Sequence, residues 1–297
     1  MGYSLEQKIN KPKSCIITVN YFASELLGNI TALAEKYGFD LIIVDNSCNA
    51  DESEALKNIH GIVVTNSDNV GFGTGCHIGI EEAKRHSEYE NFLFVNPDIT
   101  EIDFSKIAEA LEAFGRDHNA AYFQPLILDN RGEESILGIR ATSDARVVLL
   151  YTFIKKIFTS LEYYVLHAKE LSKNTTNIYI PSGAFFIVKA NVFDRIGGFP
   201  RDTFLYFEEW LFAARVKKLG MYGYIDPSLR VHHEIGYSTG LQYGAGSAKM
   251  LRYRHDAFLT AAVIILSNTV IALAAKGVIW LDYGVRSLIL NLKRGRQ

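Results

Sequence analysis

The sequence predicts an α/β protein whose parallel sheet is covered by helices on both faces. Four short apolar runs recur in the first half of the chain, each run ends in polar residues, and the intervals have room for crossover helices. The runs are continuously apolar rather than alternating, which is typical of strands buried on both faces of a parallel sheet. Their first residues, 15, 41, 61 and 92, lie 26, 20 and 31 residues apart.

The predicted elements follow one another along the chain as alternating strands and helices. Strands are expected over 15–19, 41–44, 61–64, 92–95 and 121–128, with a helix in each of the first three intervals. The apolar, tyrosine-rich stretch 147–171 is expected to be helical, and 177–188 to form a strand, a bend and a second strand. A short helix over 190–196 and a longer one near 206–219 each stop at a glycine.

Composition excludes several classes of protein. The chain has 297 residues, of which 48% are hydrophobic and 22% charged, so it is neither disordered nor fibrous, and it is long enough for two domains or one enlarged α/β domain. A net charge of −2 argues against a nucleic-acid binder. Three cysteines without a CxxC pair indicate neither a disulfide framework nor a zinc site, and favour a reducing, cytosolic compartment. The first 14 residues lack the apolar stretch of a signal peptide.

Polar clusters follow the four N-terminal strands, at 20–21, 45–47, 66–69 and 96–98. Ligands of open α/β sheets bind beyond the carboxyl ends of the strands. The sequence therefore predicts that these four clusters line one crevice.

A glycine-rich segment, residues 69–79, precedes a helical pattern. Its four glycines would let backbone amides approach a phosphate closely. The segment is neither GxGxxG nor a P-loop, so a dinucleotide-binding fold is not favoured. A plain tight turn is the structural alternative.

Two further groups of residues suggest metal or acid–base chemistry. Asn96 and Asp98, at the end of an apolar strand, offer oxygens to a divalent cation and leave its other positions to diphosphate, although an Asx turn would also explain them. Glu208 and Glu209 stand near a helix start among aromatic residues, where burial would raise the pKa of a carboxyl toward a general-base value. The preference of acids for helix N-termini is the alternative explanation.

Two adjacent histidines, His232 and His233, are candidates for a cation ligand. A neutral imidazole can bind a metal, and a surface turn is the alternative.

The C-terminal segment differs from the rest of the chain. Residues 257–275 carry no charge, which is near the length of a membrane span, but polar residues such as Asn268 argue against a true span. An apolar helical stripe follows, at Val278, Leu281, Val285, Leu288 and Leu292. From Arg252 onward seven Lys and Arg residues stand against two Asp. We expect residues 246–297 to extend a domain of residues 1–245 and to contact an anionic membrane surface, the same chain, or a second copy in a homo-oligomer.

Seven segments, in this order and spacing, carry a resemblance to a known family. They are VNY (19–21), VDNS (44–47), NVGFGTGCHIGI (69–80), VNPD (95–98), SGAFFIVKANVFDRIGGF (182–199), FLYFEEWLFAARVKKLG (204–220) and HEIGYS (233–238). Together they resemble the family 2 glycosyltransferases, of GT-A fold, and more narrowly the bacterial rhamnosyltransferase-like branch. The resemblance covers about residues 14–240.

The resemblance implies an inverting, metal-dependent hexosyltransferase. Such an enzyme moves rhamnose or a related sugar from a dTDP- or UDP-linked donor to a hydroxyl of a glycan, for cell-surface polysaccharide. The basic, apolar C-terminal segment fits a lipid-linked acceptor at the cytoplasmic face of the inner membrane. Asp45 would contact the base, and the nucleotide-sugar-binding residues would be Val19, Asn20, Tyr21, Asp45, Asn69, Gly71, Gly75, Asn96 and Gly183.

The resemblance also implies roles for the acids and histidines. Asp98 would bind Mg²⁺ or Mn²⁺ together with His233, or with His232 if the alignment slips by one. Glu209, with Glu208 as the alternative, falls where the family has its catalytic Asp, and the family's next Asp is Leu211 here.

Two other functions remain open from the sequence. A non-catalytic module on the same fold, binding a sugar nucleotide or a partner, is one, because fold does not fix function. A nucleotidyltransferase is the other, but it would need a basic loop where Tyr21 and the next residues stand.

Overall fold

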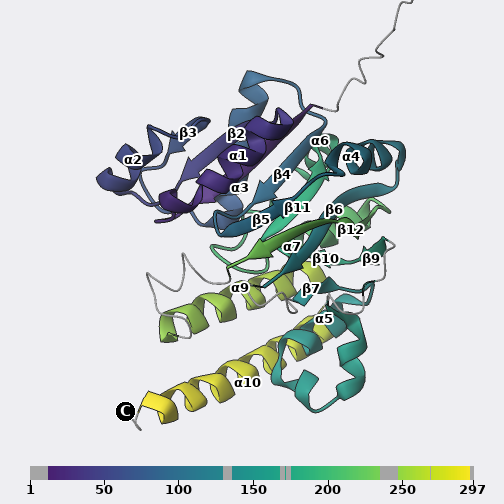
Figure 1. Ribbon diagram of the computed structural model, residues 1–297. Helices are drawn as coiled ribbons and strands as arrows, with labels where there is room; N and C mark the ends of the chain where they lie inside the picture. The colour runs from purple at the N-terminus through teal and green to yellow at the C-terminus, as the bar shows by residue number, and fades with distance from the viewer. Residues whose placement is uncertain are drawn as a thin grey trace, which may run out of the picture.

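A nine-stranded sheet forms the centre of the computed structural model, which describes residues 13–129, 136–167, 171, 175–234, 247–267 and 269–294. Eight strands follow the order β3-β2-β1-β4-β11-β6-β12-β5, and β9 pairs with β12. Helices flank the sheet, and α9 and α10 lie below it in Figure 1. A three-stranded sheet, β10-β7-β8, lies beside it.

The strands are β1 (Ser14–Asn20), β2 (Asp40–Asp45), β3 (Ile62–Thr65), β4 (Asn91–Val95), β5 (Ile99–Asp103), β6 (Ala120–Leu128), β7 (Ile136–Ile139), β8 (Val165–His167), β9 (Thr176–Ile178), β10 (Ile180–Pro181), β11 (Phe185–Lys189) and β12 (Tyr222–His233). Strands β1 to β4 are parallel to one another, and so are β6 and β12, whereas β11, β5 and β9 run antiparallel to their neighbours. The sheet is thus mixed and mainly parallel, which confirms the predicted fold class.

The helices are α1 (Gly28–Tyr37), α2 (Ala50–Leu56), α3 (Phe72–His86), α4 (Ile107–Arg116), α5 (Asp144–Tyr151), α6 (Ala190–Ile196), α7 (Glu208–Lys218), α9 (Ala248–Leu266) and α10 (Thr269–Arg294), with short 3-10 helices η1 (Ser24–Leu26), η2 (Phe153–Lys156) and η3 (Thr159–Tyr164). Helices α1, α2 and α3 occupy the three predicted crossover intervals. Local signals set several boundaries: Asn49 caps α2 by accepting bonds from two backbone amides, and α1 ends at Gly38 in the left-handed conformation.

The stretch 147–171 differs from the helix that the sequence predicts. Helix α5 ends at Tyr151, two 3-10 turns follow, and Val165 begins a strand. A distant partner explains the change, because the backbone N–H of Phe153 donates to Asp282 Oδ1 of α10 at 2.7 Å. That contact replaces the hydrogen bond that would have continued α5.

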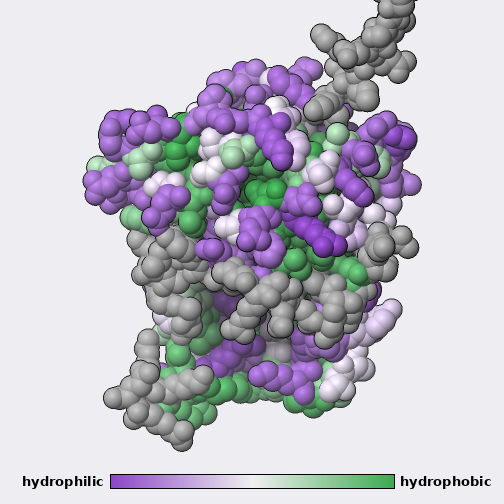
Figure 2. All heavy atoms as spheres, viewed as in Figure 1, coloured by the Kyte–Doolittle hydropathy of each residue, from purple (hydrophilic) through white to green (hydrophobic). Residues whose placement is uncertain are grey.

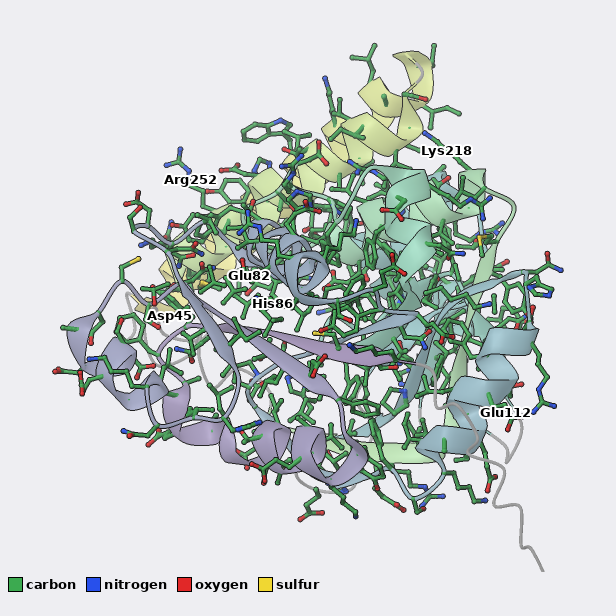
Figure 3. All side chains as sticks on the ribbon, turned by 90° about the horizontal axis from the view of Figure 1, so that it is seen from above. Asp45, Glu82, His86, Glu112, Lys218 and Arg252 are labelled. Atoms are coloured by element: carbon green, nitrogen blue, oxygen red, sulfur yellow. The ribbon has the colours of Figure 1, made fainter. Side chains whose placement is uncertain are left out.

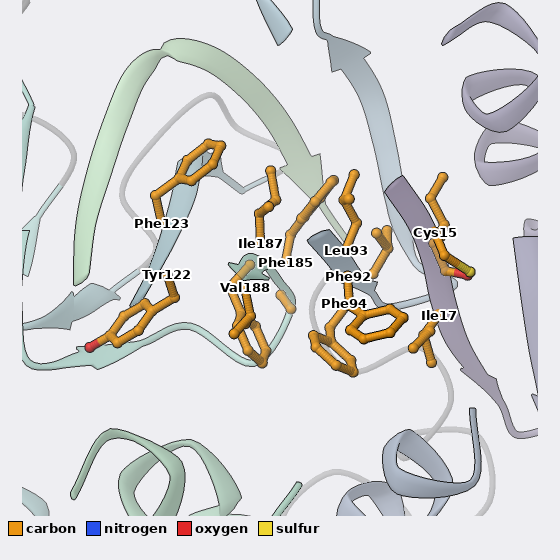
Figure 4. Close-up of a cluster of buried hydrophobic side chains, with 14 of the residues drawn as sticks. Cys15, Ile17, Phe92, Leu93, Phe94, Tyr122, Phe123, Phe185, Ile187 and Val188 are labelled. Carbon is orange, nitrogen blue, oxygen red and sulfur yellow. The ribbon is translucent and has the colours of Figure 1, made fainter. Parts of the chain in front are cut away.

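Two hydrophobic cores hold the elements together. The larger lies along the sheet and is rich in aromatic rings, several of which appear in Figure 4. The smaller joins α5, α7, α9 and α10, with Trp210, Phe258 and Ile279 almost fully buried. The second core fixes the C-terminal helices against α7.

The uncharged stretch 257–275 does not form one helix. Helix α9 ends at Leu266, Ser267 adopts a left-handed φ of 35°, and α10 begins at Thr269. Asn268 lies outside the described residues, as do the predicted domain boundary at 245 and residues 235–238 of the HEIGYS segment. No helix in the described ranges is long and apolar enough to span a membrane.

Candidate active site

A cavity of about 670 Å³ lies beyond the carboxyl ends of β1 and β4. Its walls come from these strand ends, the start of α3, the bend between β10 and β11, the start of α7, the end of β12 and helix α9. Ten of the predicted site residues line it, namely Val19, Tyr21, Asn69, Gly71, Asn96, Asp98, Gly183, Glu208, Glu209 and His233. Asn20, Asp45, Gly75 and His232 are not among its lining residues.

Each of the four polar strand-end clusters reaches this cavity. Tyr21, Asn46, Asn69 and Asn96 come from the four clusters in turn, and all line it. The crevice that the strand pattern predicts is therefore present.

Asn20 and Asp45 form a hydrogen-bonded support behind the cavity wall. Both are fully buried, and Asn20 Nδ2 lies 3.1 Å from Asp45 Oδ1, 3.2 Å from Ser47 Oγ and 3.0 Å from Glu52 Oε2. The backbone N–H of Ser47 also donates to Asp45 Oδ1 at 3.0 Å. These bonds tie the ends of β1 and β2 to α2, and a direct contact of Asp45 with a nucleotide base stays a prediction. Figure 3 marks Asp45.

The glycines of the 69–79 segment are explained by close packing. A Cβ on Gly71 would lie 2.2 Å from the carbonyl oxygen of Phe204, and one on Gly73 would lie 2.3 Å from that of Pro200. A Cβ on Gly79 would lie 2.5 Å from Ile17 Cγ2 of β1, and one on Gly75 3.0 Å from Val19. The first two glycines let the segment before α7 approach α3, and the last two let α3 approach the sheet.

Asp98 and His233 meet at one end of the cavity. His233 Nε2 lies 3.1 Å from Asp98 Oδ1, and the backbone N–H of Glu234 donates to the carbonyl oxygen of Asp98 at 2.9 Å. Adjacent residues of a strand point to opposite faces. His232 accordingly turns away and lies 3.4 Å from Glu101 Oε2.

The Asp98–His233 pair suits a divalent cation. Asp98 Oδ1 is buried and makes no hydrogen bond of acceptable geometry, so its lone pairs are available. A separation of 3.1 Å is compatible with both atoms binding one cation at about 2.0–2.1 Å from each. No group of three or more His, Cys, Asp and Glu residues among those described could hold a metal, so substrate oxygens or water would complete the coordination.

Glu208 and Glu209 begin α7 after a strained turn. Tyr206 and Phe207 both adopt left-handed backbone conformations, with φ of 79° and 66°, which costs on the order of 1–3 kcal/mol for each such residue. Packing holds the turn, since the ring of Phe207 stacks on Phe258 of α9 at a centroid distance of 4.6 Å. The turn directs two consecutive carboxyls toward the cavity.

Gly183 makes room for the Glu209 carboxyl. A Cβ at position 183 would lie 1.8 Å from Glu209 Oε1, so no other residue type fits there without moving Glu209. Burial raises the pKa of Glu209. It raises the pKa of Glu208 still more clearly, and the neighbouring Glu209 adds to that rise. Raised pKa values of this kind suit a proton acceptor that works near neutral pH.

The lining residues that were not among the predicted site residues include Tyr151 of α5, and Met250 and Arg254 of α9. Met250 and Arg254 are four residues apart and share one helix face. The mixture of charged and apolar residues over 249–258 was a sequence signal for an amphipathic helix. It did not show which face lines the cavity, because the α7 residues of that cavity, such as Glu209, are more than forty residues away in the chain.

Comparison with known proteins identifies the fold. No model of a known protein family matches the chain, and no curated protein matches it. Among solved structures, that of GalNAc-T7 with UDP, GalNAc and Mn²⁺ is 16% identical with a TM-score of 0.56, covering 84% of this chain and 48% of its own. A mycobacterial protein is 10% identical with a TM-score of 0.52, covering 86% of this chain and 74% of its own.

The fold is therefore that of the GT-A glycosyltransferases. The chain spans about half the length of the GalNAc-T7 chain that it matches.

Proposed function

We propose that this protein is an inverting glycosyltransferase. It transfers a hexose, rhamnose or a related sugar, from a UDP- or dTDP-linked donor to a hydroxyl of a lipid-linked glycan for cell-surface polysaccharide, at the cytoplasmic face of a membrane. The GT-A fold and the UDP and Mn²⁺ in the GalNAc-T7 structure support a nucleotide-sugar donor and a divalent cation. The sequence resemblance supports the narrower choice of sugar, and the basic, apolar C-terminal segment supports a lipid-linked acceptor.

One observation carries the proposal. The Asp98–His233 pair and the Glu209 carboxyl line the same cavity, although Asp98 and Glu209 lie more than a hundred residues apart in sequence. Inverting transfer needs two groups on opposite sides of the sugar. One binds the cation that neutralises the leaving diphosphate, and the other is a base that accepts the proton of the attacking hydroxyl.

Glu209 acts as the base in this mechanism. Its carboxylate accepts the proton of the acceptor hydroxyl as that oxygen attacks the anomeric carbon from the face opposite the diphosphate. Gly183 leaves the space in which the carboxyl lies, and the turn at Tyr206 and Phe207 directs it. Proton transfer by a positioned group contributes typically about 10²–10⁴ to the rate.

Asp98 and His233 hold the leaving-group end. They would bind a divalent cation, which when bound neutralises the negative charge that grows on the departing diphosphate. Asn96, Asn69 and Tyr21 line the same cavity and provide polar contacts to the nucleotide sugar.

Ligand-dependent thermal stability tests the donor site. UDP or dTDP with Mn²⁺ should raise the free energy of unfolding, by about 2.7 kcal/mol at a hundred times the dissociation constant, because the ligand binds only the folded state. Asp98→Asn should abolish the Mn²⁺-dependent part of this stabilisation. The control Glu101→Gln, which changes an exposed carboxyl near His232, should keep the whole stabilisation. A response to NAD or ATP in place of UDP and dTDP would contradict the proposal.

The outer face of α10 supports contact with a membrane surface. Its buried face carries Ala275, Ile279 and Asp282, whereas Leu281 and Leu288 of the predicted stripe are 58% and 61% exposed. Hydrophobic side chains lie along the lower edge of the molecule in Figure 2, over this helix. An exposed apolar stripe in a basic segment is what binding to anionic lipid requires.

Vesicle sedimentation tests this contact. The full chain should bind vesicles rich in anionic lipid, and replacing Leu281 and Leu288 together by Gln should weaken binding at least about tenfold because their apolar area no longer leaves water. The control Asn291→Gln, on the same helix, should bind as the wild type does. The proposed membrane contact would be contradicted if the Leu281 and Leu288 double variant bound vesicles as well as Asn291→Gln does. A dimer that buries the apolar stripe would contradict it too.

A further inference from the structure

Arg254 is a cation in the cavity that the proposed mechanism does not use. Met250 and Arg254 project from one face of α9 into the cavity, and Ser247 caps the first turn of this helix by accepting a bond from the backbone N–H of Met250. One turn further, Phe258 packs into the second core. The position of Arg254 is therefore fixed by a helix that is anchored on both sides of it.

The described residues leave Arg254 without a counterion. Its neighbour Arg286 is paired with Asp282 at 2.6 Å, whereas no carboxylate of the described chain lies within ion-pair distance of Arg254. Burial lowers the pKa of its guanidinium, and Arg286 lowers it further. Asp282 raises it in part, although that carboxylate is itself paired with Arg286. An arginine stays charged in proteins, so the described residues leave this positive charge without a direct ion-pair partner.

Arg254 is not among the groups that set the pKa values of the catalytic carboxyls. Both values are raised, by burial and, for Glu208, also by the charge of Glu209. Arg254 acts on two phenols: it lowers the pKa of Tyr151 and of Tyr206, against the upward effect of burial and of the charges of Glu209 and Glu208, respectively. These two side chains also line the cavity.

Three donor groups, those of Arg254, Tyr151 and Tyr206, thus line one cavity, and no hydrogen bond or ion pair among the described residues engages the Arg254 guanidinium. A guanidinium offers a planar fork of N–H groups that matches phosphate, and two phenolic hydroxyls can each donate one more hydrogen bond. Asp98 and His233, which belong to the leaving-group end, exert no resolved influence on Arg254. Arg254 therefore offers the cavity a group suited to an anion, on a different element from the Asp98–His233 pair.

We propose that Arg254, with Tyr151 and Tyr206, binds a phosphate or diphosphate group carried by the acceptor. This inference rests on the proposed function, because it assigns the second substrate of that reaction. It places the acceptor's anion on α9, the helix that packs directly against α10 and its exposed apolar stripe. A phosphate at this position lies next to the face through which a lipid-borne acceptor would arrive.

Binding of a simple isoprenyl diphosphate tests the inference. Geranyl diphosphate is titrated into the full chain in EDTA, so that binding through a divalent cation is excluded, and its affinity is compared with those of geraniol and inorganic pyrophosphate. We expect geranyl diphosphate to bind most tightly. Arg254→Gln should weaken it about tenfold or more, as expected for loss of charged hydrogen bonds.

Two variants serve as controls. Arg252→Gln, on the same helix but with a side chain that is 76% exposed and lies at the edge of the molecule in Figure 3, should bind geranyl diphosphate within about twofold of the wild type. Arg254→Lys keeps the charge but loses the fork, and should fall between wild type and Arg254→Gln.

Binding of UDP with Mn²⁺, measured on the same proteins, separates the possible failures. An unchanged UDP affinity in Arg254→Gln supports the inference and shows that the variant is folded. An equal loss of UDP affinity would overturn it, because Arg254 would then hold the donor. Pyrophosphate binding as tightly as geranyl diphosphate would also overturn it, since the anion would need no acceptor. A third result would be that UDP does not bind at all while geranyl diphosphate still binds in an Arg254-dependent way. That result would count against the proposed function and not against the anion site.

Discussion

Polar side chains on the β1–β2 side of the cavity bond to one another, whereas on the α7–α9 side Glu208 Oε1 and the Arg254 guanidinium have no hydrogen-bond or ion-pair partner among the described residues. On the first side Asn20, Asp45, Ser47 and Glu52 form one buried network. On the second side Glu208 Oε1 is buried without a hydrogen bond, after two residues in strained conformations. Buried unpaired groups cost stability, and they persist in proteins mainly where function requires them.

The difference separates support from chemistry. The paired side fixes the positions of the strand ends, and the unpaired side keeps groups free to meet a substrate. Substitutions on the two sides should therefore have opposite signatures: loss of stability on the first, and loss of activity with equal or greater stability on the second.

Glu209→Gln should give the largest effect. The amide keeps the shape of the side chain and removes the base, so sugar transfer should fall about 10²–10⁴-fold. The affinity for UDP with Mn²⁺ should stay within about twofold, because the change lies away from Asp98. Steady-state transfer assays across pH would also show, in the wild type, a rate that rises with pH above the ordinary glutamate pKa of about 4.3, since burial raises the pKa of Glu209.

Full activity in Glu209→Gln would remove the base assignment. Glu112→Gln is the matched control, because Glu112 lies on the exposed face of α4, where it pairs with Arg116.

The N-terminal half of the fold could be predicted from the sequence because its signals are local. Each of β1 to β4 is a continuous apolar run followed by polar residues, and the parallel arrangement then brings the strand ends together. The cavity contributions of Asn46, Asn69 and Asn96 followed from that pattern alone.

The C-terminal contribution could not be predicted in the same way. The sequence shows that α10 is amphipathic, but not that Asp282 would turn inward to accept a bond from Phe153 while Leu288 faces outward. Nor does it show that α9 brings Arg254 to the cavity, which depends on packing between Phe207 and Phe258. Contacts between residues far apart in the chain decide these placements. The hydrophobic periodicity of a helix sequence does not, because it fits more than one orientation of that helix.

Asp45→Ala should give the next largest effect, and on stability. Removing this carboxylate leaves the buried N–H of Ser47 without its acceptor and takes one acceptor from Asn20, at a cost of about 2–3 kcal/mol. Chemical denaturation measures the loss, with Asp68→Ala, at an exposed aspartate, as the control. A stable variant that binds UDP poorly would instead mean that Asp45 contacts the nucleotide directly.

Glu208→Gln should have the smallest effect and the opposite sign. Because burial and the charge of Glu209 raise the pKa of Glu208, the folded protein holds this proton more tightly than the unfolded chain does. The free energy of unfolding should therefore fall as pH rises from the unfolded value, about 4.3, through the folded pKa. Glutamine cannot ionise, so the variant should match the wild type near pH 4 and exceed its stability by about 1–2 kcal/mol at pH 8, the cost of one unpaired buried group.

Urea denaturation at both pH values measures this difference, and the control Glu112→Gln should show no such divergence from the wild type. If Glu208→Gln were instead destabilised at pH 8, the ionised carboxylate would be part of a paired network, and the contrast between the two sides of the cavity would be wrong.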